Sequence, residues 1–178
     1  MPNWCSNYVS VSHSDPAMLD KFLTAAKEDK IAHTFFPVPE SVERHANKKL
    51  LSDAEYYWRN DNWGTKWDFG GDFDRDFDGD SDTVTGYVNT AWSPPVGVFA
   101  ALEEHGFVVK AYWHEGNMCF AGEYENGETI DYSNIEYTDE GLSKLPETIV
   151  ELFNLADMIE EEEDEDWKKR FYFLKGFW

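Results

Sequence analysis

Aspartates occupy every second position from Asp74 to Asp82, and this spacing could bind a calcium ion. The segment places Gly79 after its third aspartate, which matches the start of a calcium-binding loop. The glutamate expected to close such a loop is replaced by Thr85. The alternative is an acidic hairpin in which Phe73 and Phe77 pack while the carboxylates face water. Under the first interpretation the metal ligands are Asp74, Asp76, Asp78, Asp80 and Asp82.

A second group of residues could form a small-molecule pocket. Aromatic rings can wall such a pocket, and a few polar side chains can orient the ligand inside it. Residues 62–68 and 90–93 combine these residue types, and we expect them on neighbouring strands. The alternative is structural, with tryptophans packing the sheet against helices and Ser93 beginning a helix. The pocket interpretation predicts a site formed by Asn62, Trp63, Lys66, Trp67, Asp68, Thr90, Trp92, Ser93 and Glu115.

Catalytic motifs are not recognisable in the chain. Its five histidines lack metal-ligand spacing, and neither a nucleophile-elbow motif nor a nucleotide-binding glycine motif is found. His114 and Glu115 could pair as a base and its orienting group, but a solvated histidine is the commoner case. Cys5 lies in an alternating pattern and is expected in the core. We therefore expect a protein that is not an enzyme and needs no cofactor, with calcium as the one ion that the aspartate segment could bind.

Acidic residues dominate the charge of the chain. Among 178 residues, 36 are acidic and 15 are basic, which gives a formal net charge of -21. A polyanion repels phosphate backbones, so we expect no direct binding to nucleic acid and instead a partner with a basic surface. Like charges at helical spacing weaken a helix, so the longest acidic run is either a frayed, solvated end or a functional surface. This run consists of Glu160, Glu161, Glu162, Glu163, Asp164, Glu165 and Asp166.

The elements that must position these residues alternate between strands and helices. Period-two alternation predicts strands over residues 3–12, 63–73, 83–92, 107–115 and 117–124, with a short strand near 129–132. Amphipathic patterns predict helices over 15–28, 93–106 and from 144 into the acidic run. Two prolines predict an extended connector over 33–40.

This order predicts an α+β fold of the ferredoxin-like split βαβ type. One antiparallel sheet would carry helices on one face, with an inserted segment at 40–60, an extra hairpin and a C-terminal acidic helix. We expect a ferredoxin-like domain over 1–135, with residues 136–178 packed on it. The apolar tail, which includes Phe171, Phe173 and Trp178, would dock on the same domain or form a homodimer.

Several short motifs resemble one known family. They are MPNWCSN at 1–7, FPVP at 36–39, NWGTKWD at 62–68, TAWSPP at 90–95, and EG with FAG between 115 and 122. Their order over residues 1–135 resembles the YubB-type ferredoxin-like family of bacteriophages and conjugative plasmids. The resemblance implies a fold and a mobile-element setting, and it supplies no catalytic residues because the family's molecular function is not established.

Charge and resemblance together predict an acidic interaction protein of phage or mobile-element origin. It would bind, and by imitating phosphate spacing inhibit, a host protein that acts on nucleic acid or in defence. The alternative is a small-ligand or calcium-binding module. No signal peptide and no membrane-spanning run of about 20 apolar residues is recognisable, so we expect the host cytosol, with Cys5 and Cys119 reduced rather than bridged.

Overall fold

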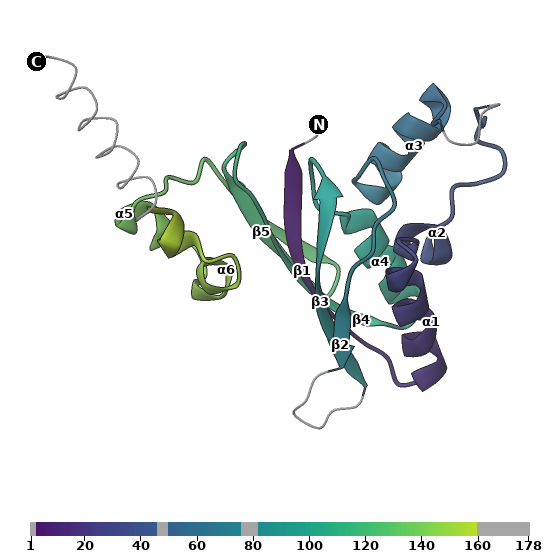
Figure 1. Ribbon diagram of the computed structural model, residues 1–178, viewed down its shortest axis with the longest axis horizontal. Helices are drawn as coiled ribbons and strands as arrows, with labels where there is room; N and C mark the ends of the chain where they lie inside the picture. The colour runs from purple at the N-terminus through teal and green to yellow at the C-terminus, as the bar shows by residue number, and fades with distance from the viewer. Residues whose placement is uncertain (1–2, 46–49, 76–81, 160–178) are drawn as a thin grey trace, which may run out of the picture.

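The fold is built on a six-stranded antiparallel sheet (Figure 1). The structure, a computed structural model, describes residues 3–45, 50–75 and 82–159. The strands follow the order β2-β3-β1-β4-β5-β6, in which the first four have the ferredoxin-like arrangement and the last two form the extra hairpin. The predicted fold class is therefore confirmed. The strands are β1 (Trp4–Ser12), β2 (Phe73–Arg75), β3 (Thr83–Ala91), β4 (Val108–Glu115), β5 (Phe120–Glu125) and β6 (Glu128–Ser133).

Alternation along β1 divides the sheet into two faces. Odd-numbered residues such as Val9 are buried on the first face, whereas even-numbered residues such as Tyr8 lie on the second face. In the register, Val9 lies opposite Gly86 of β3 and Ala111 of β4, so the neighbouring strands share the same division.

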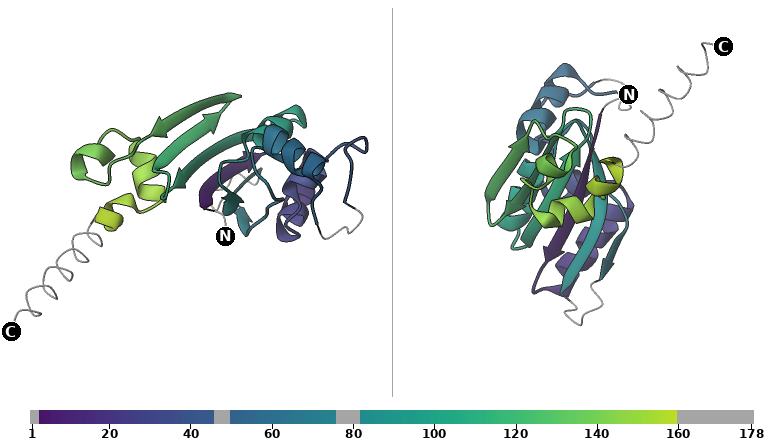
Figure 2. Two further views of the ribbon diagram at one scale, coloured as in Figure 1. Left: turned by 90° about the horizontal axis from the view of Figure 1, so that it is seen from above. Right: turned by 90° about the vertical axis from the view of Figure 1, so that its left-hand side faces the viewer.

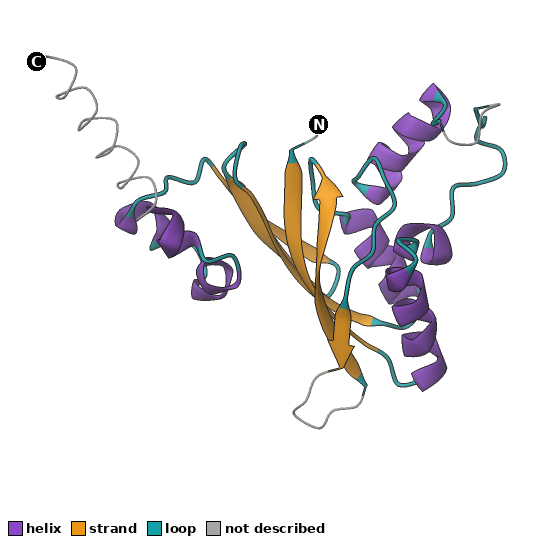
Figure 3. Ribbon diagram, viewed as in Figure 1, coloured by secondary structure: helices purple, strands orange, loops and turns teal. Residues whose placement is uncertain are grey.

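Four helices cover the first face (Figure 3). They are α1 (Pro16–Lys27), α2 (Ile31–Phe35), α3 (Asp53–Trp63) and α4 (Val96–Glu104). Asp15 and Pro16 begin α1 as the sequence predicts, because the Asp15 carboxylate accepts the backbone N–H of Ala17 at 2.9 Å. Phe22 of α1 and Phe99 of α4 are both buried in the core between these helices and the sheet.

Two short helices, α5 (Asp139–Leu142) and α6 (Glu147–Leu152), lie on the second face, which corrects the expectation of helices on one face only (Figure 2). Ile149 and Leu155 are fully buried there against Tyr112 and Ala121 of β4 and β5. The long helix predicted from residue 144 is broken after Leu152, and helical structure resumes at residue 155 and continues to 159, where the described residues end. α5 and α6 pack mainly on the β4–β5 half. Among the described residues, they reach β3 where the Tyr87 hydroxyl donates to the carbonyl of Leu152 at 3.0 Å, and they leave much of the β1–β3 half open.

The strand predicted over residues 63–73 is wrong, since most of this segment is the end of a helix and a loop. Ser52 caps α3 by accepting the N–H of Glu55 at 3.0 Å, and Gly64 ends it with a left-handed backbone at φ 84°. Among the described residues of this region, the pairing with β3 is limited to Phe73–Arg75. The connector predicted over 33–40 likewise begins within α2 and extends only after Phe35. In the described part of the chain, no helix combines the length and apolar character that crossing a membrane requires.

Acidification should weaken the packing of the C-terminal helices through His114. This side chain is 8% exposed, and its Nε2 lies 2.8 Å from the hydroxyl of Tyr137. Burial lowers the pKa of His114 below its usual 6.5, against the opposing effect of the Glu115 charge. A histidine whose pKa is lower in the folded state stabilises the fold fully above the unfolded pKa, and this contribution is lost as the pH falls through and below 6.5.

Urea denaturation at about pH 7.5 and about pH 5.5 measures this effect. We expect the wild-type chain to lose more free energy of unfolding on acidification than His114→Gln. His33→Gln is the control, because His33 is exposed, and it should behave like the wild type. An equal loss in all three proteins would contradict the role given to His114.

Candidate functional site

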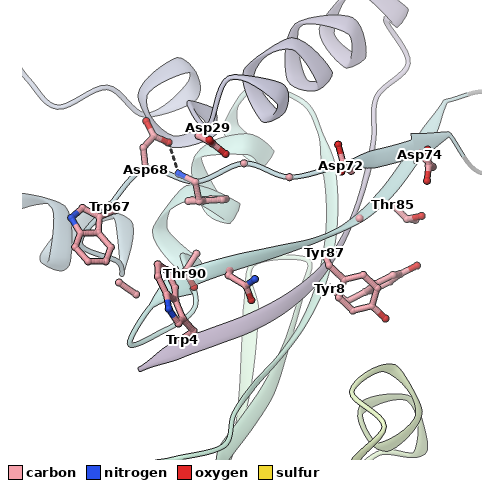
Figure 4. A pocket seen from close by; sticks show the side chains of 16 residues that line it. Trp4, Tyr8, Asp29, Trp67, Asp68, Asp72, Asp74, Thr85, Tyr87 and Thr90 are labelled. Carbon is pink, nitrogen blue, oxygen red and sulfur yellow. Dashed lines mark hydrogen bonds between the residues drawn. The ribbon is translucent and has the colours of Figure 1, made fainter. Parts of the chain in front are cut away.

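An open cleft of about 910 Å3 lies on the β1–β3 half of the second face. Its floor comes from β1 and β3, and its rim comes from the segment that leads from α3 into β2 (Figure 4). The alternation of β1 and β3 turns Tyr8, Thr85, Tyr87 and Asn89 away from the buried first face and toward this side. The cleft therefore exists because the C-terminal helices cover only part of the second face.

Two pairs of aromatic rings stand at opposite ends of the cleft (Figure 4). The ring centroids of Trp4 and Trp67 are 5.8 Å apart, and those of Tyr8 and Tyr87 are 5.1 Å apart in an edge-on arrangement. Trp4, Trp67 and Tyr87 are 49%, 37% and 51% exposed, so each of these rings is partly open to solvent. Rings with accessible faces can bind apolar groups and attract cations.

Four carboxylates, those of Asp29, Asp68, Asp72 and Asp74, complete the lining of the cleft. Among the described residues, none that lines the cleft is a lysine, arginine or histidine. Negative groups along a walled concavity focus the electric field and raise the local concentration of cations. The cleft is thus suited to a positively charged group that also contacts aromatic rings.

One of these carboxylates also has a structural task. Asp68 accepts the backbone N–H groups of Ala32 at 2.8 Å, His33 at 2.9 Å and Phe69 at 2.9 Å, which fixes the start of α2 against the cleft rim. Burial raises the pKa of Asp68, and these three donors act in the opposite direction. Asp72 and Asp74 are therefore better targets than Asp68 for changing the charge of the cleft without changing the fold.

Three of the residues predicted for the tryptophan pocket converge beside the cleft. The Lys66 ammonium lies 4.8 Å from the ring centroid of Trp67, 5.3 Å from that of Trp92 and 5.5 Å from that of Tyr56. Tyr56 was not predicted, because it lies on α3 and no sequence spacing connects it with Trp92. The ring of Trp67 thus contacts Lys66 and also pairs with Trp4 of the cleft.

The other predicted pocket residues serve the core or the turns. Trp63 is fully buried, and its indole N–H donates to the carbonyl of Phe36 at 2.7 Å. The amide of Asn62 donates to the carbonyl of Trp58 at 2.8 Å. These contacts hold α3 together and fix it to the segment after α2, so both side chains serve the fold.

Thr90, Ser93 and Glu115 also make internal hydrogen bonds. Thr90 lines the cleft, is 2% exposed, and its hydroxyl donates to the carbonyl of Ser93 at 2.8 Å, while the Ser93 hydroxyl donates to the carbonyl of Gly64. Glu115 is 1% exposed, and its carboxylate accepts the backbone N–H groups of Asn117 and Met118. His114 and Glu115 take part in separate bonds, to Tyr137 and to this turn, and do not form a catalytic pair.

The predicted calcium ligands and the acidic run fall largely outside the described residues. Asp74 is in β2 and Asp82 precedes β3, while Asp76, Asp78 and Asp80 are outside. Within the described ranges, no three histidine, cysteine or carboxylate side chains are placed to hold a metal ion. The calcium site stays a prediction, as does the role of residues 160–166. The aromatic tail after residue 166 also lies outside the described residues.

The two cysteines are separate thiols in this structure. Burial raises the pKa of the Cys5 thiol to about 12, an effect that the nearby Glu115 charge strengthens. A thiol that stays protonated near neutral pH is a poor nucleophile, so Cys5 is a core residue.

Several cleft residues were missed by sequence reasoning. Trp4, Tyr8 and Tyr87 are outward-facing aromatic residues in alternating strands, and that position was the available signal. Asp29 carries no local signal, whereas Asp72 extends the alternation of aspartates by one step before Asp74, and the fold alone brings Asp29 and Asp72 to one cleft.

Comparison with known proteins gives one match. A family model described as a ferredoxin-like domain in Api92-like protein matches residues 62–167. This range begins in α3 and includes β2 to β6, whereas the resemblance noted in the sequence was placed over residues 1–135. Searches of curated proteins and of solved structures give no match to the chain.

Proposed function

The chain belongs to the family of ferredoxin-like domains in Api92-like proteins, and we propose that within this family it is a non-enzymatic interaction protein that binds a basic surface of a partner protein. The observation that carries the proposal is the cleft, which combines four carboxylates and accessible aromatic rings, with no basic side chain among its described lining. Arginine and lysine side chains of a partner fit this lining, because they pair with carboxylates and also stack on aromatic faces.

Long-range electrostatics support the same proposal. The formal net charge of -21 attracts basic surfaces at a distance, and the cleft then offers specific contacts to the arriving cationic side chains. The acidic run at residues 160–166 would add to this attraction. Phosphate backbones are repelled by the same field, so the partner is a protein rather than a nucleic acid.

The setting of the proposed interaction comes from the resemblance to the YubB-type family of phages and conjugative plasmids. A protein from such an element acts in the cytosol of its host, so the partner is a host protein. A basic surface is typical of proteins that act on nucleic acid. Inhibition of such a protein, including one used in defence, is the outcome that we propose.

A small cationic ligand is the second candidate. The cleft volume of about 910 Å3 lies within the size range of ligand sites, and aromatic walls with carboxylates suit an organic amine. The melting temperature of the purified chain distinguishes the two functions. If the ligand is a small amine, adding that amine alone should raise the melting temperature, without any partner protein.

Capture from a lysate of a bacterial host tests the proposed function. The full chain, immobilised, should retain a defined host protein at about 50 mM salt and release it at about 500 mM, because screening weakens attraction between charged surfaces. Asp72→Asn combined with Asp74→Asn should lose most of this capture. Glu104→Gln combined with Glu128→Gln removes the same charge from exposed positions outside the cleft, and should retain it. Equal capture by both pairs would show that only overall charge matters.

A further inference from the structure

A second cavity, of about 630 Å3, opens at the end of the sheet where β1 and β5 begin and β3 and β6 end. We call it the Trp92 pocket; its apolar lining consists of Trp92, Met118, Phe120 and Tyr132. Met118 is 69% exposed and Trp92 is 39% exposed, which is unusual for side chains that would gain free energy from burial. Asn3 and Asp131 add polar groups to its lining.

The backbone around this pocket is held in an unfavourable conformation. Trp92 has φ 70° and Cys119, between two pocket residues, has φ 54°. The other described residues with positive φ are asparagine, aspartate or glycine, which tolerate this region far better than tryptophan or cysteine. Conformations of this kind persist only where the surrounding structure enforces them, and they cluster at binding sites. The backbone N–H of Trp92 is fixed by donating to the carbonyl of Asn3 at 2.9 Å.

The Trp92 pocket lies beside the acidic cleft, although none of the described residues lines both. Asn3 lines the pocket and the next residue, Trp4, lines the cleft. The Lys66 ammonium bridges the two, because it lies 5.3 Å from the Trp92 ring centroid and 4.8 Å from that of Trp67. A single partner surface can therefore contact the carboxylates of the cleft and the apolar pocket together.

We infer that the Trp92 pocket receives an apolar side chain, aromatic or branched aliphatic, from the same basic partner protein whose cationic side chains enter the cleft. This inference rests on the proposed function and adds the apolar anchor of the interface. Buried apolar anchors beside charged contacts commonly supply most of the binding free energy. The proximity of the pocket to the acidic cleft and the Asp131 carboxylate in the pocket lining favour a basic partner. A second copy of this chain is disfavoured, because both molecules would carry a formal charge of -21.

Nuclear magnetic resonance with two small probes tests the inference on the full chain. N-acetyl-phenylalanine amide represents the apolar side chain, and N-acetyl-arginine amide represents the cationic one. We expect the phenylalanine probe to shift the Met118 methyl and Trp92 indole signals in a saturable way. In Trp92→Gly its affinity at Met118 should fall about tenfold, as for the loss of an aromatic anchor, while the arginine probe should still shift Trp4 and Trp67.

The fold of Trp92→Gly should be intact, because glycine adopts φ 70° without strain, and its melting temperature should not fall. Met118→Lys, at a largely exposed position, is the second variant, and it should abolish the shift of the Trp92 indole by filling the pocket with a charge. The pocket would be overturned if the phenylalanine probe left the Met118 methyl signal of the wild type unshifted. It would also be overturned if the probe shifted Met118 equally in Trp92→Gly, or the Trp92 indole equally in Met118→Lys. If the phenylalanine probe shifted Met118 but the arginine probe shifted neither Trp4 nor Trp67, the pocket would be supported and the proposed function would be contradicted.

Discussion

Replacement of Trp63 by alanine is expected to lower the free energy of unfolding by about 3–5 kcal/mol, the range for deleting a large buried aromatic side chain. Trp63 is fully buried, and its indole N–H donates to the carbonyl of Phe36 at 2.7 Å. The ring also packs edge-on against Trp58 at 6.0 Å and lies 4.7 Å below the Arg59 guanidinium. The alanine variant would leave a cavity between α3 and the sheet together with an unpaired carbonyl. Urea denaturation followed by circular dichroism measures the loss.

Trp67→Ala is the matched control, since it removes the same residue type four positions along the chain. Trp67 is 37% exposed and lies at the cleft, so its loss should cost about 1 kcal/mol or less while weakening binding. If Trp63→Ala were as stable as Trp67→Ala, the placement of Trp63 in the core would be contradicted. Trp63 could then line the pocket predicted from the sequence, together with Trp67 and Trp92.

Reversal of two cleft charges is expected to slow partner association about ten- to hundredfold. Asp72→Lys combined with Asp74→Lys places cations where the cleft has carboxylates, so arriving basic side chains meet repulsion instead of attraction. The association rate of the captured host protein, measured by surface plasmon resonance, reports this effect directly. The dependence of the rate on salt should also become weaker in the variant.

Glu104→Lys combined with Glu128→Lys makes the same change in net charge at exposed positions outside the cleft. This control should slow association only a few-fold, because it alters the overall field without touching the binding surface. Equal slowing in both variants would mean that net charge alone governs the encounter, and that the cleft is not the contact surface.

Local signals were enough to predict much of the sheet and the first helix. Alternation gave β1, β3 and β4 within one or two residues at each end, and Asp15 with Pro16 gave the start of α1. The order of these elements was enough for the ferredoxin-like arrangement. The extra hairpin also followed from alternation, although its strands are shifted by a few residues.

Prediction failed where local pattern and tertiary packing disagree. Dense aromatic residues around Trp63 suggested a strand, yet Ser52 at one end and Gly64 at the other set the limits of a helix. The helix predicted from residue 144 was interrupted after Leu152, where Asn154 has φ 50°. Neither the position of α5 and α6 on the second face nor the half-open sheet that results can be read from periodicity.

The candidate site was only partly predictable for the same reason. Lys66, Trp67 and Trp92 were expected together because their motifs combine aromatic and polar residues, and the structure joins them. The cleft itself unites Trp4 with Trp67 and Asp29 with Asp72, which are far apart in the chain. Such pairs arise from strand order and loop path, so no spacing in the sequence reveals them.

The most direct test of the account is a titration of the purified full chain with N-acetyl-arginine amide, followed at the indole N–H signals of Trp4 and Trp67. We predict saturable shifts of both signals in the wild type, and a loss of affinity in Asp72→Asn combined with Asp74→Asn, because these carboxylates line the same cleft and raise the local concentration of the cationic probe. Unmoved indole signals, or equal affinity in the wild type and the double variant, would contradict the claim that this cleft binds cationic side chains.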